Sequence, residues 1–283
     1  LWGLFKKVVI SDRLAIYVNM IYAHPDQYHY INLMIAVVLF SFQIYCDFSG
    51  YSDIAIGSAK TMGFDLMTNF NRPYFAKNIQ EFWAKWHISL STWFRDYVYF
   101  PLGGNRKGKT RTYVNVAIIF LLSGLWHGAN WTFVIWGALH ALFMVLYLAA
   151  KSKRIIPETN NLVFNFVSVF FTFCLVSLAW VYFRAENINQ ANSFLGYIWN
   201  RNSPSPFADY LVDTNLKFIF NKFSFVISIC LIVLLMVFEK RWKPHMLELN
   251  EQKTTDMVLN VFLAVMILVF GVFKSTSFIY FQF

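Results

Sequence analysis

The chain has 283 residues, of which 58% are hydrophobic and only 14% charged, and its mean hydropathy is +0.47. Soluble domains contain about 25% charged residues, so this composition excludes an ordinary soluble domain and indicates a membrane protein. The net charge of +9 does not predict nucleic-acid binding, because the basic residues form short clusters beside apolar segments, as in the cytoplasmic loops of membrane proteins. These clusters lie at residues 105–111, 151–154 and 240–243.

The three cysteines favour neither a disulfide framework nor a metal site. Cys46, Cys174 and Cys230 each lie inside or at the end of an apolar segment, and no two have the spacing of a ligand pair. We therefore predict no metal site and no bound cofactor.

The first 23 residues carry Lys6, Lys7, Asp12 and Arg13 among apolar positions. This pattern suits a helix that lies at the membrane interface or enters the membrane at a slant. The chain begins without Met and without the pattern of a signal peptide, so we expect it to be the C-terminal part of a longer protein.

Four apolar segments approach the roughly 20 residues that a membrane-spanning helix needs. They are residues 27–46, 162–183, 223–238 and 257–273, and the last two are short. The long uncharged stretch at residues 112–150 is a separate case and is treated below. These segments predict an all-α protein with several membrane-spanning helices.

A polar sequence, DFSGYSDIAIG, begins directly after the apolar segment that ends at Cys46. Carboxylates at this depth usually face protein or water rather than lipid, so Asp47, Ser49, Tyr51 and Asp53 are candidates for a substrate-binding surface. The alternative is a helix end that Asp and Ser cap, with no role in binding.

Residues 81–100 have helical periodicity. In a continuous helix Trp83, His87, Leu90 and Phe94 would share one stripe, with the charged side chains elsewhere. We therefore expect His87 to point with an aromatic helix face.

The stretch from Thr112 to Ala150 contains no Asp, Glu, Lys or Arg. As one helix its 39 residues would be about 58 Å long, almost twice the thickness of the hydrocarbon core. We predict a break within SGLWHGAN, where Gly124 and Gly128 weaken the helix. Irregular backbone at membrane depth occurs where it is buried in protein or lines a cavity, so we expect His127 to face a cavity.

His127 has two interpretations. A lone histidine in an apolar helix is often a packing residue bonded to a carbonyl, but ionisable groups inside membranes are usually functional. The helix break and the second polar candidate, His87, favour a functional His127, whereas His140 on a more regular helix is expected to pack. Trp126 and Asn130 in the same motif are further substrate-binding candidates.

Two sequence blocks, WHISLSTWFRDYVYFPLGG and GLWHGANWTFVIWG, carry a family resemblance. The chain resembles the membrane-bound O-acyltransferases, in particular the bacterial alginate O-acetyltransferase-like branch, most strongly over residues 40–145. The resemblance implies a single transmembrane domain over residues 1–283, with broken or re-entrant helices around a central catalytic cavity. It also implies that His127 is catalytic and that His87 assists it.

The function that the resemblance implies is transfer of an acetyl group from a cytoplasmic thioester, such as acetyl-CoA, to an exported or cell-surface polysaccharide. A bacterial inner-membrane location, contact with membrane lipids and a periplasmic acetyl-transferring partner are further expectations. Transfer of a D-alanyl or long-chain acyl group on the same fold remains an alternative. A transporter or channel is another, although no internal repeat or ring of like charges supports it.

Overall fold

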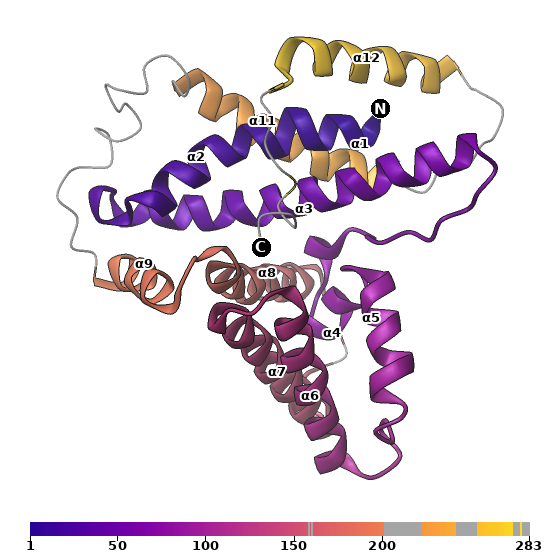
Figure 1. Ribbon diagram of the computed structural model, residues 1–283, viewed down its shortest axis with the longest axis vertical. Coiled ribbons are helices and arrows are strands. Elements are labelled where there is room, and N and C mark those ends of the chain that lie inside the picture. Colours follow the sequence, from indigo (N-terminus) through magenta and orange to yellow (C-terminus); the bar gives the residue numbers. More distant parts are fainter. Residues whose placement is uncertain (158, 160, 201–221, 242–253, 274–277, 279–283) are drawn as a thin grey trace. The chain divides into compact units, whose positions relative to one another are not determined.

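The computed structural model describes residues 1–157, 159, 161–200, 222–241, 254–273 and 278. Lys243 of the third basic cluster lies outside these ranges, whereas the predicted span 257–273 lies within them. The described residues form helices and no strands, which confirms the all-α prediction (Figure 1). Their contacts divide the chain into two compact units.

The first unit contains residues 1–66 and 193–282. It begins with α1 (Trp2–Leu4), a π-helical turn η1 (Phe5–Ser11) and α2 (Asp12–Ala23), followed by the short η2 (Pro25–Gln27) and the long α3 (Tyr30–Thr61). Its later helices are α11 (Lys222–Arg241) and α12 (Thr254–Phe270), while α9 (Ile188–Asn200) crosses the boundary between the units.

The N-terminal helices run antiparallel to α3 and pack along it (Figure 1). The hydroxyl of Ser11 in η1 donates to the carbonyl of Gln43 at 3.1 Å, and the hydroxyl of Tyr17 in α2 donates to Asn32 at 3.4 Å, so residues later in this N-terminal segment meet residues earlier in α3. The apolar side chains between them, including Phe5 and Leu14, are fully buried.

The helix α3 extends well beyond the predicted end of the apolar segment at Cys46, because it continues to Thr61. Asp47, Ser49 and Asp53 therefore lie within a helix and not at its end, so the interpretation of these residues as a helix cap is wrong. The helix tolerates its buried carboxylates because lysines from η1 pair with them, as described below.

The second unit contains residues 67–192. Its elements are η3 (Pro73–Phe75), α4 (Ile79–Trp83), α5 (Ile88–Phe94), η4 (Arg95–Tyr99), α6 (Lys109–His127), α7 (Trp131–Ser152) and α8 (Leu162–Arg184). The helix α7 packs against both α6 and α8, and α4 packs against α7 (Figure 1).

The predicted break in the uncharged stretch is confirmed. Helix α6 ends at His127 and α7 begins at Trp131, where the side-chain oxygen of Asn130 accepts the backbone N–H of Thr132 at 3.1 Å. The chain then turns back, so that α6 and α7 form an antiparallel hairpin.

Two glycines allow α6 and α7 to approach closely. A Cβ on Gly124 would meet the carbonyl oxygen of Phe133, and a Cβ on Gly137 would meet the carbonyl oxygen of Phe120. The backbone of each helix thus occupies the space where the other would need a side chain.

We expect Gly137→Ala to destabilise the protein by about 1 to 3 kcal/mol, because the added methyl group overpacks the α6–α7 contact. The matched control is Gly57→Ala in α3, where a Cβ would meet nothing within 4 Å. That substitution should be neutral or stabilising, since alanine favours helix by roughly 1 kcal/mol over glycine. Melting temperatures of the two variants in one detergent test the difference, and equal shifts would contradict the close packing.

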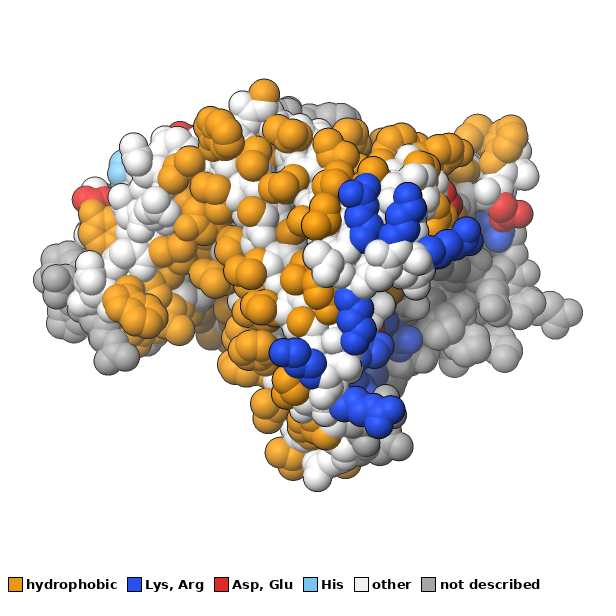
Figure 2. Space-filling view, turned by 90° about the horizontal axis from the view of Figure 1, so that it is seen from below, with side chains coloured by type: hydrophobic (Ala, Val, Ile, Leu, Met, Phe, Trp, Pro, Cys, Tyr) orange, Lys and Arg blue, Asp and Glu red, His pale blue; other side chains and the backbone are white. Residues whose placement is uncertain are grey.

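Within the described residues, three helices are long and apolar enough to cross a membrane, by length and composition: α3, α7 and α8. The predicted span 162–183 corresponds to α8, and a shorter apolar helix covers Met257–Phe270. Large apolar side chains are exposed on α8, among them Phe166 at 72% and Phe170 at 61%. Hydrophobic side chains also occupy much of the face in Figure 2, as expected for a surface that meets lipid.

Candidate functional site

The second unit brings together two histidines that are separated by 40 residues of sequence. His87 lies in the turn between α4 and α5, and His127 is the last residue of α6. The two imidazoles are close enough to interact electrostatically. The indole of Trp126 lies beside both, with its ring centroid 6.2 Å from that of His87 and 5.0 Å from that of His127.

The backbone at His87 adopts a left-handed conformation, with φ 45° and ψ 56°. This is uncommon for a residue other than glycine and costs on the order of 1 to 3 kcal/mol. The continuous helix predicted over residues 81–100 is therefore wrong, because α4 ends at Trp83 and α5 starts only after His87. His87 does not share a helical stripe with Trp83.

Asn69 fixes the turn that carries His87. Its carbonyl accepts the backbone N–H of Ile88 at 3.0 Å, and its side-chain oxygen accepts both the N–H and the hydroxyl of Ser89 at 3.1 and 2.7 Å. These bonds offset part of the backbone strain. Asn69 was not identified from the sequence, because nothing in one sequence pairs it with a turn almost twenty residues later.

The His87 side chain is buried, with 8% of its surface exposed. His87 lies outside the three candidate membrane spans, and burial lowers its pKa to about 4 because a charged imidazole would lose its hydration. At neutral pH His87 is therefore uncharged and has one nitrogen that donates and one that accepts hydrogen bonds.

His127 has a mostly aromatic environment but is only partly buried. The rings of Trp136 and Phe183 lie edge-on to the imidazole, with centroids at 5.1 and 5.2 Å, and come from α7 and α8. Three helices thus hold the ring, which remains partly exposed. This is the arrangement expected for a group that a substrate must reach.

His140 has the environment of a packing residue. It is fully buried in α7, and its Nδ1 accepts the indole N–H of Trp83 at 3.3 Å. The aromatic rings of Phe82, Phe120, Phe143, Trp83, Trp136 and Trp180 surround it. Its Nε2 has no hydrogen-bond partner among the described residues.

The polar residues after Cys46 lie in the first unit, whereas both histidines lie in the second. The buried Nζ of Lys6 donates to the hydroxyl of Ser49 at 2.8 Å and lies 2.6 Å from a carboxylate oxygen of Asp53. Lys7 pairs with Asp47 at 2.5 Å and with Asp12 at 2.9 Å.

These ion pairs give Asp47, Ser49 and Asp53 a structural role in joining η1 to α3. Burial alone would lower the pKa of Lys7, but its hydrogen bonds to Asp47 and Asp12 outweigh this effect and raise the pKa above its ordinary value. Lysines in an apolar N-terminal segment and aspartates at the end of an apolar span were the sequence signal for this pairing.

The other three substrate-binding candidates differ in accessibility. Tyr51 is 51% exposed and packs against Phe278, with ring centroids 4.8 Å apart. Trp126 is 58% exposed next to both histidines, so it is the candidate best placed to contact a substrate. Asn130 caps α7 and its side-chain amide donates to the carbonyl of Glu186 at 2.7 Å, which gives it a structural role.

Comparison with known proteins provides an independent line of argument. The family model of the membrane-bound O-acyltransferases matches residues 1–183, which include both histidines and more than half of the chain. The chain is 45% identical over 198 residues to a probable alginate O-acetylase AlgI of Pseudomonas putida, covering 70% of this chain and 40% of that protein.

Two further relatives are named for different activities. A peptidoglycan O-acetyltransferase of Helicobacter pylori is 34% identical over 294 residues, covering 99% of this chain and 55% of that protein. A teichoic acid D-alanyltransferase of Bacillus subtilis is 40% identical over 115 residues, covering 38% of this chain and 29% of that protein. The chain thus spans about half the length, or less, of these relatives. With the family match over residues 1–183 and the two histidines inside it, the chain belongs to the membrane-bound O-acyltransferase family.

Proposed function

We propose that this chain carries the acyl-transfer site of a bacterial inner-membrane enzyme that O-acetylates an exported or cell-surface polysaccharide. The observation that carries the proposal is the pairing of the accessible His127, at a break between two helices, with the buried, uncharged His87. Membership of the family and the O-acetylating relatives support the same activity.

In the proposed reaction His127 acts as the general base. It takes the proton from an acceptor hydroxyl while the hydroxyl oxygen attacks the carbonyl carbon of an acetyl thioester. The tetrahedral intermediate then collapses, the C–S bond breaks, and the leaving thiolate takes the proton back from His127. The products are an O-acetyl ester and a free thiol.

His87 serves the same reaction in one of two ways. As a hydrogen-bond donor it would stabilise the negative charge that develops on the carbonyl oxygen, and as an acceptor it would orient the attacking hydroxyl. The aromatic rings around His127 would exclude water, which otherwise competes for the thioester.

The donor in this proposal is a cytoplasmic thioester such as acetyl-CoA, and a periplasmic partner protein passes the acetyl group on to the polymer. Analysis of O-acetyl esters on surface polysaccharides, with and without the full-length gene, tests the proposal. Loss of esters from one polymer on deletion, restored by the wild-type gene, would support it. Unchanged ester content in every surface polymer would contradict it.

The similarity to the teichoic acid D-alanyltransferase favours one second candidate, transfer of a D-alanyl group. The same chemistry applies, since only the acyl group differs. Chemical identification of the acid released from the polymer by mild base distinguishes the two, because one reaction yields acetate and the other alanine.

We expect no acetyl-cysteine intermediate. Cys46 is fully buried in α3, and Cys174 and Cys230 are exposed on apolar helices, and apolar surroundings disfavour the thiolate form that a nucleophilic cysteine needs. A variant with all three changed to serine should therefore retain acetylation within about three-fold of wild type. Mass spectrometry of enzyme trapped during turnover provides the direct test, and an acetylated cysteine required for turnover would overturn direct transfer.

A further inference from the structure

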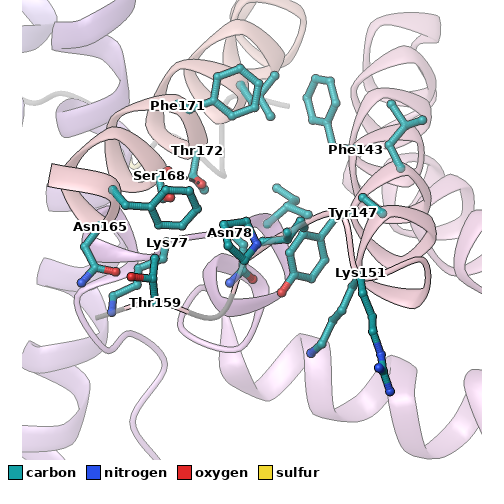
Figure 3. A pocket seen from close by; sticks show the side chains of 18 residues that line it. Lys77, Asn78, Phe143, Tyr147, Lys151, Thr159, Asn165, Ser168, Phe171 and Thr172 are labelled. Atoms are coloured by element: carbon teal, nitrogen blue, oxygen red, sulfur yellow. Dashed lines mark hydrogen bonds between the residues drawn. The ribbon is translucent and has the colours of Figure 1, made fainter. Parts of the chain in front are cut away.

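A cavity of about 1140 Å³ lies in the second unit, between α7 and α8 and beside the segment before α4 (Figure 3). It is near the end of α7 that carries Lys151, whereas His127 contacts Trp136 near the other end of the helix. On α7 the cavity lining runs from Phe143 to Lys151, and Phe143 lies about seven residues, or roughly 10 Å along the helix axis, beyond Trp136. Neither His87 nor His127 lines the cavity.

The cavity lining is amphipathic. Lys77, Lys151 and Arg154 provide positive charge, whereas Phe143 and Phe171 belong to its apolar wall. In Figure 3 these two phenylalanines lie at one end of the cavity, and Lys77 and Lys151 lie towards the other. Such a cavity matches a molecule with an anionic head and an apolar tail.

The three cations are available to a ligand. All three side chains are exposed, and none forms an ion pair with a carboxylate in the part of the chain that the structure describes. The nearby Glu81 pairs instead with Lys85, at 2.6 Å. A phosphate group would supply the missing negative charge and accept hydrogen bonds from lysine and arginine.

The apolar wall of the cavity continues onto the surface that faces lipid. Phe171 and Leu146 both line the cavity, yet they are 61% and 58% exposed on α8 and α7, two of the candidate membrane spans. Lys151 lies in the last turn of α7 and Arg154 just beyond it, where the chain leaves the apolar region. The end of a membrane-spanning helix is the level at which lipid head groups are expected.

We propose that this cavity is a binding site for an anionic phospholipid. The phosphate contacts Lys77, Lys151 and Arg154, and an acyl chain lies between α7 and α8 against Phe143 and Phe171. The location of the basic cluster fits, because positive residues beside a span mark the cytoplasmic side, where basic pockets between helices bind anionic head groups. A water-soluble anion would not use the apolar end.

The test compares phosphatidylglycerol and phosphatidylcholine with identical acyl chains, titrated into the purified full-length protein, with bound lipid counted by native mass spectrometry. We expect wild type to bind phosphatidylglycerol at least about ten-fold more tightly than phosphatidylcholine. The double variant Lys151→Glu/Arg154→Glu should lose this preference. Ser168→Trp, which fills the cavity without changing its charge, should weaken binding of both lipids.

A matched control keeps the change in net charge the same. Lys109→Glu/Lys153→Glu reverses two exposed lysines that do not line the cavity and should retain the preference within about two-fold. The proposal would be overturned if the wild-type protein bound the two lipids equally. It would also be overturned if the control and the cavity variant lost the preference for phosphatidylglycerol to the same extent. Displacement of bound phosphatidylglycerol by coenzyme A would also overturn it, because the site would then belong to a soluble phosphate ligand. None of these measurements depends on acyl transfer, so the proposed function can fail separately.

Discussion

His127→Ala in the full-length protein is expected to abolish detectable acetylation, while the protein still inserts into the membrane and accumulates at near-normal levels. Removal of a general base costs about a hundred-fold to ten-thousand-fold in rate. The protein should survive the change because His127 is the last residue of α6 and is only partly buried, so its loss leaves no closed cavity in the core. Acetyl esters per amount of folded protein are the quantity to measure.

His140→Ala is the matched control, since it removes another histidine from the same aromatic cluster. His140 is fully buried and contacts Trp83, so its truncation leaves a cavity and an unpaired indole N–H. We expect a lower melting temperature, with the rate per folded molecule largely retained. Near-normal acetylation by His127→Ala at equal abundance would refute the catalytic role of His127 and favour a structural or transport function.

His87 allows a sharper experiment, because its backbone conformation separates the role of the side chain from that of the turn. Glycine adopts φ 45° freely, whereas alanine in this region costs about 1 to 2 kcal/mol. If the imidazole bonds a reacting group, His87→Gly and His87→Ala should both lose about 10² to 10³ in rate. The alanine variant should in addition melt at a lower temperature than the glycine variant.

The alternative is that His87 only maintains the turn between α4 and α5. In that case His87→Gly would keep near-normal acetylation. Any decrease in acetylation by His87→Ala would be proportional to the decrease in the amount of folded protein. Asn69→Ala provides a second comparison, since it removes the side-chain bonds to Ser89 and leaves the imidazole in place. A smaller rate loss in this variant than in His87→Gly would support direct participation of the imidazole.

Several features of this protein follow from the sequence because they depend on local properties of the chain. Apolar segments of membrane-spanning length predict helices in any context, so α8 matched its predicted range closely. The length of the uncharged stretch excluded a single helix, and its glycines located the break beside His127 correctly. The family resemblance rests on contiguous motifs and was confirmed by the match over residues 1–183.

Other features depended on contacts between segments that are distant in sequence. Helical periodicity over residues 81–100 predicted one helix, but Asn69 binds the backbone after His87 and stabilises a left-handed turn that propensity alone disfavours. The ion pairs of Asp47 and Asp53 with Lys7 and Lys6, some 40 residues earlier, were likewise not predicted from the sequence, which marked the two aspartates only as candidates for a polar substrate surface. The sequence by itself determined the long apolar helices, the break beside His127 and the candidate groups, because apolar length and glycine act locally. Only the tertiary structure decided which groups pair and which side chains remain accessible, because burial and charge neutralisation depend on neighbours that the chain brings together by folding.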